Sequence, residues 1–137
     1  MKRIWVVDDD EEMLRAVRLM LGVLDHHATT FLGARSAAQM LLDGDRPDLM
    51  ILDINMPEVT GLDMLEFLRR HPATRSLPVV MLSTEASDVI VDRARALGAD
   101  AYVSKPVTVE ELERAINEAF EKRKKLMTSE MNKNVEK

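Results

Sequence analysis

Three aspartates stand directly after short apolar runs of the chain. Asp8 and Asp9 follow the run at residues 4–7, and Asp53 follows the run at residues 49–52. A carboxylate just past a buried strand lies at the rim of the sheet, where open α/β folds bind their ligands. Three carboxylates at one rim repel one another unless a proton or a cation joins them. The pattern therefore predicts a divalent-metal pocket in which an exposed Asp53 accepts a phosphoryl group.

Two more pairs of residues follow apolar runs further along the chain: Ser83 with Thr84, and Lys105 with Pro106. The Lys105 ammonium would supply a cation for phosphoryl oxygens, and the Ser83 hydroxyl would donate to another oxygen. Proline biases the preceding residue toward an extended conformation and permits a cis peptide bond, which could hold the ammonium over the pocket. A carboxylate such as Asp53 can act as a nucleophile and form an acyl phosphate.

The ligand types favour a hard cation. The chain has no cysteine, and its three histidines have no spacing typical of a metal site. Clustered carboxylates without softer ligands select Mg²⁺, with Mn²⁺ able to substitute. Mg²⁺ keeps several waters and takes one or two carboxylates, which leaves positions for phosphate oxygens.

Each of these residues alone also has a structural explanation. Acids after the first run are good N-cap and first-turn residues of a helix, and Asp53 could begin a turn toward Pro57. Ser83 alone could be a capping hydroxyl, and Lys105 alone could be a solvated loop residue. Their joint occurrence after four predicted strands favours one shared site.

The elements that must position these residues alternate as repeated βα units, which predicts an α/β fold around a parallel sheet. The least apolar strand, 27–31, is expected at an edge. Right-handed crossovers bring the strand ends to one edge of the sheet. The predicted strands are 3–7, 27–31, 48–52, 78–82 and 101–104. The predicted helices contain Leu14 to Leu24, 34–43, Gly61 to just before Pro72, 87–97 (ended by Gly98), and a segment opening with Thr108 and Glu111.

The length and charge of the chain limit the class of protein to which it can belong. The 137 residues form one domain, lack an apolar stretch long enough for a membrane span, and begin without a secretory signal. The absence of cysteine suits a cytoplasmic location. Residues 121–137 carry six Lys or Arg against three Glu, a balance of +3, which leaves −8 for residues 1–120. The acidic body argues against nucleic-acid binding. The basic run 122–125 is expected to complete the last turn of a helix.

Four stretches together resemble the receiver domain of two-component response regulators. The resemblance covers about residues 2–122, so the expected organisation is a receiver domain over 1–122 and a basic, frayed or flexible tail over 123–137. The matching stretches are Val6 to Asp10, Pro47 to Pro57 with Gly61, Leu77 to Ser83, and Leu97 to Pro106.

The resemblance implies a flavodoxin-like, three-layer fold with five strands in the order 2-1-3-4-5 and five helices, an order the family shares with flavodoxin. It implies that Asp53 receives a phosphoryl group from a histidine kinase or phosphotransfer protein. By the same resemblance Asp9 and Asp53 bind Mg²⁺ directly, Asn55 contributes its main-chain carbonyl, and Asp8 acts through water. Ser83 and Lys105 would contact the phosphoryl oxygens.

The resemblance also assigns switching and tuning positions. Ser83 would move toward the phosphoryl group while Tyr102, the aromatic residue on the fifth strand, turns inward. Thr84 departs from the small residue usual in the family and would slow exchange at the acyl phosphate. Asn55 and Glu85 hold positions that tune dephosphorylation by orienting water.

The implied readout is a surface made by the segments 87–97, 101–104 and the helix from Thr108. Through it the chain would bind a separate, unidentified protein, as a stand-alone receiver or part of a larger regulator, as a monomer or a phosphorylation-dependent dimer. It would not be an enzyme beyond a single self-phosphorylation and slow autodephosphorylation.

Two other classes stay open. A haloacid-dehalogenase-like phosphatase also uses an aspartyl nucleophile with Mg²⁺ and a lysine, but it needs an acid two residues later, where this chain has Asn55. A phosphate-independent interaction module would fit the fold, although such degenerate receivers typically lose the acids or the lysine. A nucleotide or flavin binder is less favoured because no Gly-rich loop follows the first strand.

Overall fold

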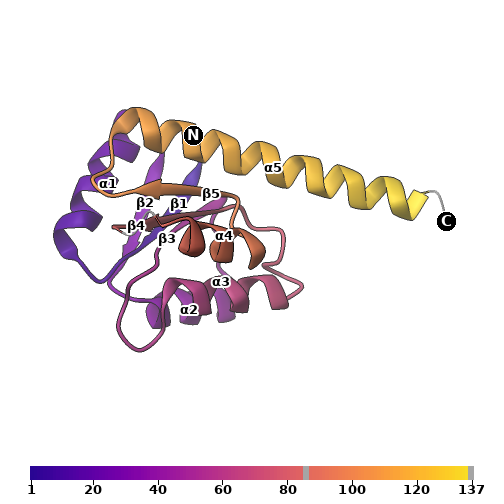
Figure 1. Cartoon of the computed structure of the whole chain (residues 1–137), viewed down its shortest axis with the longest axis horizontal. Helices are drawn as coiled ribbons and strands as arrows, with labels where there is room; N and C mark the ends of the chain where they lie inside the picture. The colour runs from indigo at the N-terminus through magenta and orange to yellow at the C-terminus, as the bar shows by residue number, and fades with distance from the viewer. Residues whose placement is uncertain (85–86, 136–137) are drawn as a thin grey trace.

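The computed structural model describes residues 1–84 and 87–135. Within them, five strands alternate with five helices along the chain (Figure 1). The strands are β1 (Arg3–Val7), β2 (His27–Phe31), β3 (Leu49–Asp53), β4 (Val79–Ser83) and β5 (Ala101–Ser104). The helices are α1 (Glu11–Val23), α2 (Ala34–Leu42), α3 (Gly61–Arg70), α4 (Asp88–Ala96) and α5 (Val109–Val135).

The strands form one parallel sheet in the order β2-β1-β3-β4-β5, which confirms the predicted flavodoxin-like topology. β2 lies at an edge, as its polar sequence indicated. β3 and β4 begin one residue later than predicted and run one residue further. Asp53 pairs with Leu82 and is therefore the last residue of β3 rather than the first residue of the loop.

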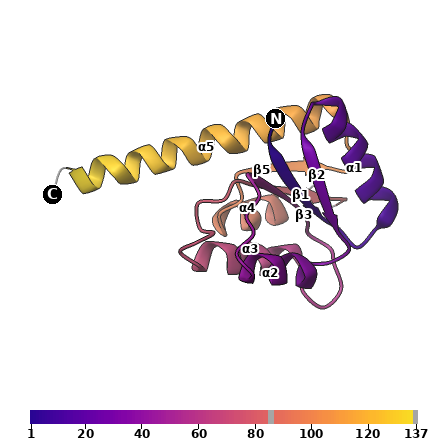
Figure 2. The same ribbon diagram turned by 180° about the vertical axis from the view of Figure 1, so that it is seen from behind.

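Helices cover both faces of the sheet, so the molecule has three layers (Figures 1 and 2). Alternate residues of β1 point to opposite faces: Ile4 and Val6 pack with α1 and α5, whereas Trp5 and Val7 pack with α2, α3 and α4. β3 and β4 are buried along their whole length because both of their faces are covered. This burial fixes the strand ends that carry the polar residues.

α5 is longer than the sequence predicted. The expectation was a frayed helix end or flexible tail beyond Lys125, but the helix continues to Val135 and projects past the sheet (Figures 1 and 2). The segment contains neither Gly nor Pro after Pro106 and is rich in Glu, Lys, Arg and Met, which favour helix. At its start, the Glu111 main-chain N–H donates to the Thr108 hydroxyl at 3.2 Å, as their capping spacing predicted.

The basic run 122–125 does not complete a last helical turn, because the helix passes through it. Lys122 Nζ donates to the Ala99 carbonyl at 3.1 Å, and Arg123 Nε pairs with Asp100 Oδ1 at 2.6 Å. Arg69 pairs with the other oxygen of Asp100 at 2.9 Å. We call Arg69, Asp100 and Arg123 the basal cluster, since they lie where β4 and β5 begin.

Among the described residues, no helix combines the length and apolar character that crossing a membrane requires.

Candidate functional site at the carboxyl ends of the strands

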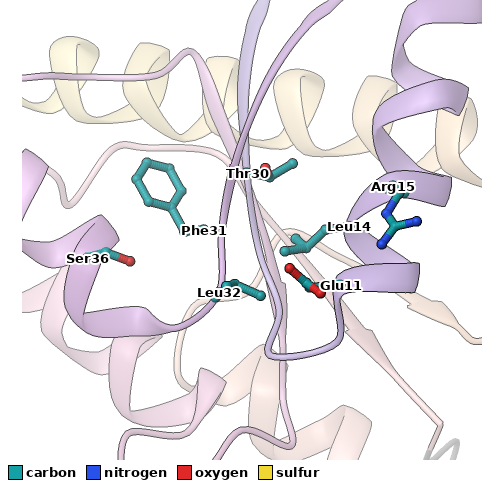
Figure 3. Close-up of a pocket in the computed structure, with 7 residues that line it drawn as sticks. All are labelled: Glu11, Leu14, Arg15, Thr30, Phe31, Leu32 and Ser36. Atoms are coloured by element: carbon teal, nitrogen blue, oxygen red, sulfur yellow. The ribbon is translucent and has the colours of Figure 1, made fainter.

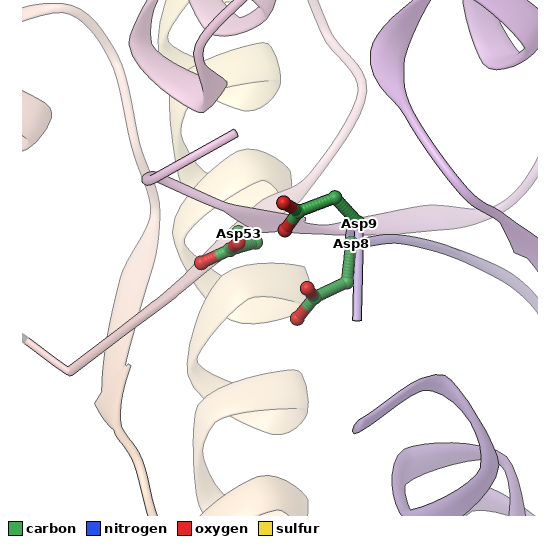
Figure 4. Close-up of side chains that lie close together, drawn as sticks. All are labelled: Asp8, Asp9 and Asp53. Carbon is green, nitrogen blue, oxygen red and sulfur yellow. The ribbon is translucent and has the colours of Figure 1, made fainter. Parts of the chain in front are cut away.

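Three carboxylates meet at the carboxyl ends of β1 and β3. These strands are neighbours, with Val7 paired to Leu52, so Asp8 and Asp53 are the next residues along each. One oxygen from each of Asp8, Asp9 and Asp53 lies within 4.8 Å of the others (Figure 4). Asp8 and Asp53 are buried, whereas Asp9 is exposed. The sheet thus gathers three acids whose repulsion has to be offset.

Neighbouring main-chain groups fix two of these acids. The Asp10 N–H donates to Asp8 Oδ1 at 3.0 Å, and Asp10 in turn caps α1 by accepting from the Glu12 N–H at 2.9 Å. Asp10 therefore has the structural role that an acid at a helix start can have, while Asp8 and Asp9 remain with the cluster. On the other strand, the main chain of Asn55 donates to the Asp53 carboxylate.

Gly61 allows the loop after β3 to close tightly. It is the first residue of α3, and its N–H donates to the Ile54 carbonyl at 3.0 Å. A Cβ at this position would overlap the Asp53 carbonyl oxygen. Only glycine lets α3 start this close to the strand end that carries Asp53.

Lys105 supplies the cation at the site. Its Nζ lies 3.0 Å from Asp8 Oδ2 and 3.2 Å from Asp53 Oδ1. The main-chain N–H of Lys105 donates to the Ser83 carbonyl at 2.9 Å, and the Lys105–Pro106 peptide bond is cis. We call Asp8, Asp9, Asp53 and Lys105 the rim cluster. The separations are those of direct ion pairs, so folding does bring the scattered strand-end residues to one place.

The rim cluster perturbs the ionisation of two of its members. Burial and the adjacent Asp8 charge raise the pKa of Asp53 from 3.8 to about 6, against the opposing effect of Lys105 and the Asn55 N–H. Burial alone would lower the pKa of Lys105, but its hydrogen bond and charge interaction with Asp8, together with Asp53, raise it. Perturbed groups of this kind are typical of functional sites.

Asp53 is less accessible than the sequence predicted. An exposed side chain was expected, but only 3% of the residue's surface is accessible. The carboxylate belongs to the last residue of a central strand, and the Lys105 ammonium lies against it. The strand-end position was correct, but sequence could not show how closely the lysine covers the acid.

Ser83 is the buried last residue of β4, and Thr84 after it is exposed. The Asn55 side-chain Nδ2 lies 3.4 Å from Ser83 Oγ, a contact that the sequence did not predict because it joins the loop after β3 to the end of β4, 28 residues away. The sequence signal for this contact is that Asn55 stands two residues after Asp53, while Ser83 follows the apolar run of the neighbouring strand. Glu85 lies outside the described residues.

Tyr102 is half-buried on β5 and pairs with Met81, while Ser104 pairs with Ser83. Its ring packs against the core on the α2–α4 face of the sheet. Tyr102 therefore lies two residues before Ser104, the residue that pairs with Ser83. The same strand leads on to Lys105.

A separate hollow lies at the edge strand, between α1 and the start of α2 (Figure 3). Its volume is about 440 Å³, and it shares no residue with the rim cluster. Its lining mixes apolar and polar side chains: Glu11, Leu14, Arg15, Thr30, Phe31, Leu32 and Ser36. Clustered acids with a lysine occur at the rim instead, so the rim is the candidate site.

The model of the response regulator receiver domain family matches residues 4–117. The chain belongs to this family. The receiver domain is 34% identical over 121 residues to the chemotaxis protein CheY of Pseudomonas aeruginosa, an alignment covering 88% of this chain and 97% of that protein. The solved structure of Vibrio cholerae CheY4 superposes with a TM-score of 0.80 at 27% identity, covering 87% of this chain and 98% of the other.

Other relatives are longer. Protein RcaC of Microchaete diplosiphon is 33% identical over 110 residues, which are 80% of this chain but 17% of RcaC. The receiver domain thus spans nearly all of one relative and about a sixth of another. The comparisons confirm the family and the fold that the sequence predicted.

Proposed function

We propose that Asp53 accepts a phosphoryl group from a phosphohistidine of a histidine kinase or phosphotransfer protein, and that this change alters the binding of a downstream protein. The proposal is carried by one observation: three carboxylates and a lysine form the rim cluster at a single sheet edge. The single ammonium leaves this cluster with excess negative charge, which suits a divalent cation.

The donor set fits Mg²⁺, because it consists of clustered carboxylate oxygens. We expect Asp9, Asp53 and the Asn55 carbonyl to hold the ion directly and Asp8 to hold it through water. When bound, Mg²⁺, or Mn²⁺ in its place, would neutralise charge on the transferring phosphoryl group.

In the transfer, an ionised Asp53 oxygen attacks phosphorus in line with the donor nitrogen. The O–P bond forms as the N–P bond of the phosphohistidine breaks, and the imidazole leaves with a proton taken from solvent. Lys105, already 3.2 Å from Asp53 Oδ1, would follow the charge onto the phosphoryl oxygens. Ser83 would donate to another of these oxygens.

The phosphoryl group carries about −1.5 to −2 charges beside β4 and β5, in place of the single charge of the Asp53 carboxylate. Drawing Ser83 toward this charge would bias a two-state equilibrium of the loop after β4, with Tyr102 turning inward. The surface formed by α4, β5 and α5 would then present the change to a partner. Thr84, Asn55 and Glu85 would set the lifetime of the acyl phosphate.

This cycle makes the protein a switch that turns over once per phosphorylation, with slow autodephosphorylation. Its predicted partners are the phosphodonor and a downstream protein, without direct nucleic-acid or membrane binding. A cytoplasmic location belongs to the same proposal, and fractionation of cells that produce the protein would test it.

The decisive experiment is intact-mass analysis after incubation with acetyl phosphate and Mg²⁺. We expect one added phosphoryl group, which is absent with EDTA and absent in Asp53→Asn. Asp92→Asn, which changes an exposed acid on α4, is the matched control and should be modified like the native protein. An unmodified native protein that still binds Mg²⁺ would favour a phosphate-independent module. Repeated release of phosphate from small phosphomonoesters would favour a phosphatase.

A further inference from the structure

Two hydrogen bonds hold the main chain of Lys2 to the turn between α1 and β2. The Lys2 N–H donates to the His26 ring nitrogen Nδ1 at 3.2 Å. The Lys2 carbonyl accepts from the main-chain N–H of His27 at 2.9 Å. We call these two bonds the Lys2 clasp. One bond of the clasp is therefore made by a titratable side chain, and the other by main chain alone.

The end of α1 sets the position of the His26 ring. Asp25 has a φ of 63°, the left-handed conformation in which many helices end. The His26 main-chain N–H reaches back to the Leu21 carbonyl at 2.8 Å, and the Asp25 N–H donates to the Gly22 carbonyl at 3.1 Å. The half-buried His26 is thus joined to α1 through its main chain and to Lys2 through its ring.

The side chain of Lys2 connects the clasp to α5. Lys2 Nζ lies 5.3 Å from the centroid of the Phe120 ring, a distance typical of cation–π contacts. The N-terminus accordingly lies beside α5 in both views (Figures 1 and 2). Lys2 precedes β1 and His26 precedes β2, so the clasp is at the opposite end of the parallel strands from the rim cluster.

The chemistry of imidazole makes the clasp depend on protonation. A ring nitrogen accepts a hydrogen bond only while it carries no proton, so the neutral His26 ring has its proton on Nε2. When a proton from solvent bonds to Nδ1, the ring and the Lys2 N–H both present donors to each other. The bond between them is then lost, and the imidazolium stands next to a cationic side chain.

We propose that the Lys2 clasp is a pH-sensitive contact, which is closed while His26 is neutral and opens at the Lys2 N–H when His26 is protonated. Opening frees Lys2 to move away from Phe120, so protonation loosens the contact between the N-terminal segment and α5. The clasp shares no residue with the rim cluster and does not depend on the proposed function.

The charges around the ring favour opening in acid. Burial, followed by the N-terminal ammonium and Lys2, lowers the pKa of His26 from its ordinary value of 6.5. Asp25 in the turn and Glu113 on α5 act in the opposite direction and raise this pKa, but by less. Because the pKa of His26 is lower in the folded protein than in the unfolded chain, the contribution of the neutral ring is complete above about pH 6.5 and is lost as the pH falls below it.

Nitrogen-15 NMR of the full chain tests the clasp directly. At about pH 7.5 the ring nitrogens of His26 should show the proton on Nε2. At about pH 5, where His26 is protonated, the Lys2 amide should exchange with solvent roughly fivefold faster than the intrinsic pH dependence predicts, as expected for the loss of one hydrogen bond. A neutral ring with its proton on Nδ1, or a Lys2 amide whose exchange does not respond to His26 protonation, would overturn the proposal.

Substitutions separate the ring from the rest of the clasp. His26→Gln offers an uncharged acceptor at every pH, so the acid-induced increase in Lys2 exchange should disappear. His26→Phe has no acceptor, and its Lys2 amide should already exchange rapidly at about pH 7.5. An acid response in His26→Gln equal to that of the native chain would refute the proposal.

Two controls should respond to acid like the native chain. His27→Gln is the matched control, because residue 27 contributes to the clasp through its main-chain N–H, which the substitution keeps. Asp53→Asn removes the titrating carboxylate of the rim cluster and leaves the clasp intact. Loss of the response in Asp53→Asn would assign it to the rim cluster and overturn the role of His26.

Discussion

The two ends of the sheet hold clusters of charged side chains with opposite net charge. At the rim cluster, three carboxylates face one ammonium. At the basal cluster, two guanidiniums face one carboxylate: Asp100 is fully buried and is paired on one oxygen with Arg69 and on the other with Arg123. Both clusters join residues that are distant in sequence, but only the rim is left with surplus negative charge.

The excess positive charge of the basal cluster is stabilised by hydrogen bonds within the protein. Arg69 donates to the carbonyls of Gly98 and Leu77, and the Val79 N–H donates to Asp100. Burial and the neighbouring Arg123 lower the pKa of Arg69 to about 10, against the pull of Asp100, so the guanidinium still stays charged at neutral pH. The rim instead keeps the pKa of Asp53 raised. The basal cluster therefore has the contacts of a structural anchor, whereas the surplus negative charge of the rim cluster suits the cation that we propose there.

The largest effect on stability is expected at the anchor. Asp100→Ala leaves two buried guanidiniums without their carboxylate, and breaking a buried ion pair in this way costs about 3–5 kcal/mol. Urea unfolding would measure the loss. Asp100→Asn keeps an acceptor oxygen in place and should lose less. A loss below about 1 kcal/mol for Asp100→Ala would show that the basal cluster is not an anchor.

The next effect concerns the cation. At a Mg²⁺ concentration about 100 times its dissociation constant, the native protein should gain about 2.7 kcal/mol in unfolding free energy. Asp9→Asn removes a proposed direct ligand and should gain much less at the same concentration. Asp100→Asn is the control: it starts less stable but should keep the full gain, since its charge lies at the other end of the sheet. Equal gains in native protein and Asp9→Asn would contradict the rim as the metal site.

The rim could be predicted from sequence, and the basal cluster could not. In a parallel sheet with right-handed crossovers, every strand ends at the same edge, so acids and a lysine after apolar runs are enough to place Asp8, Asp53 and Lys105 together. The basal cluster joins the end of α3, the loop before β5 and the middle of α5. No shared strand edge relates these positions, so the sequence shows only three ordinary charges.

The extent of burial and the end of α5 also escaped prediction. The burial of Asp53 depends on how the Lys105 side chain lies against it, which no spacing in the sequence specifies. Beyond Lys125 the loss of apolar period suggested an irregular tail, although propensity and the absence of Gly and Pro favoured helix. The spacing of apolar residues shows where a helix packs, and α5 continues beyond the point where it packs against the sheet.

A further effect follows from the raised pKa of Asp53. Because its pKa is about 6 in the folded protein and 3.8 ordinarily, ionising it destabilises the metal-free fold. Asp53→Asn should therefore be more stable than the native protein near neutral pH, by up to about 3 kcal/mol for a shift of about two pKa units. The difference should shrink as the pH falls from about 6 to about 4, where both states of the native chain become protonated. Urea unfolding across this range would test the sign, and a native protein more stable than the variant at pH 7 without metal would be contrary to it.

The smallest effect is expected where an ion pair lies in solvent, which sharpens the contrast with the two buried clusters. Arg35 and Glu58 are 3.3 Å apart, but their side chains are 78% and 69% exposed. Solvent screening limits such pairs, so Arg35→Gln should change stability by less than about 0.5 kcal/mol. Arg35 is the better residue to replace because Glu58 has a φ of 65°, and a change there would mix backbone strain with charge. If Arg35→Gln destabilised the protein as much as Asp100→Asn, burial would not be what distinguishes the clusters from surface charge.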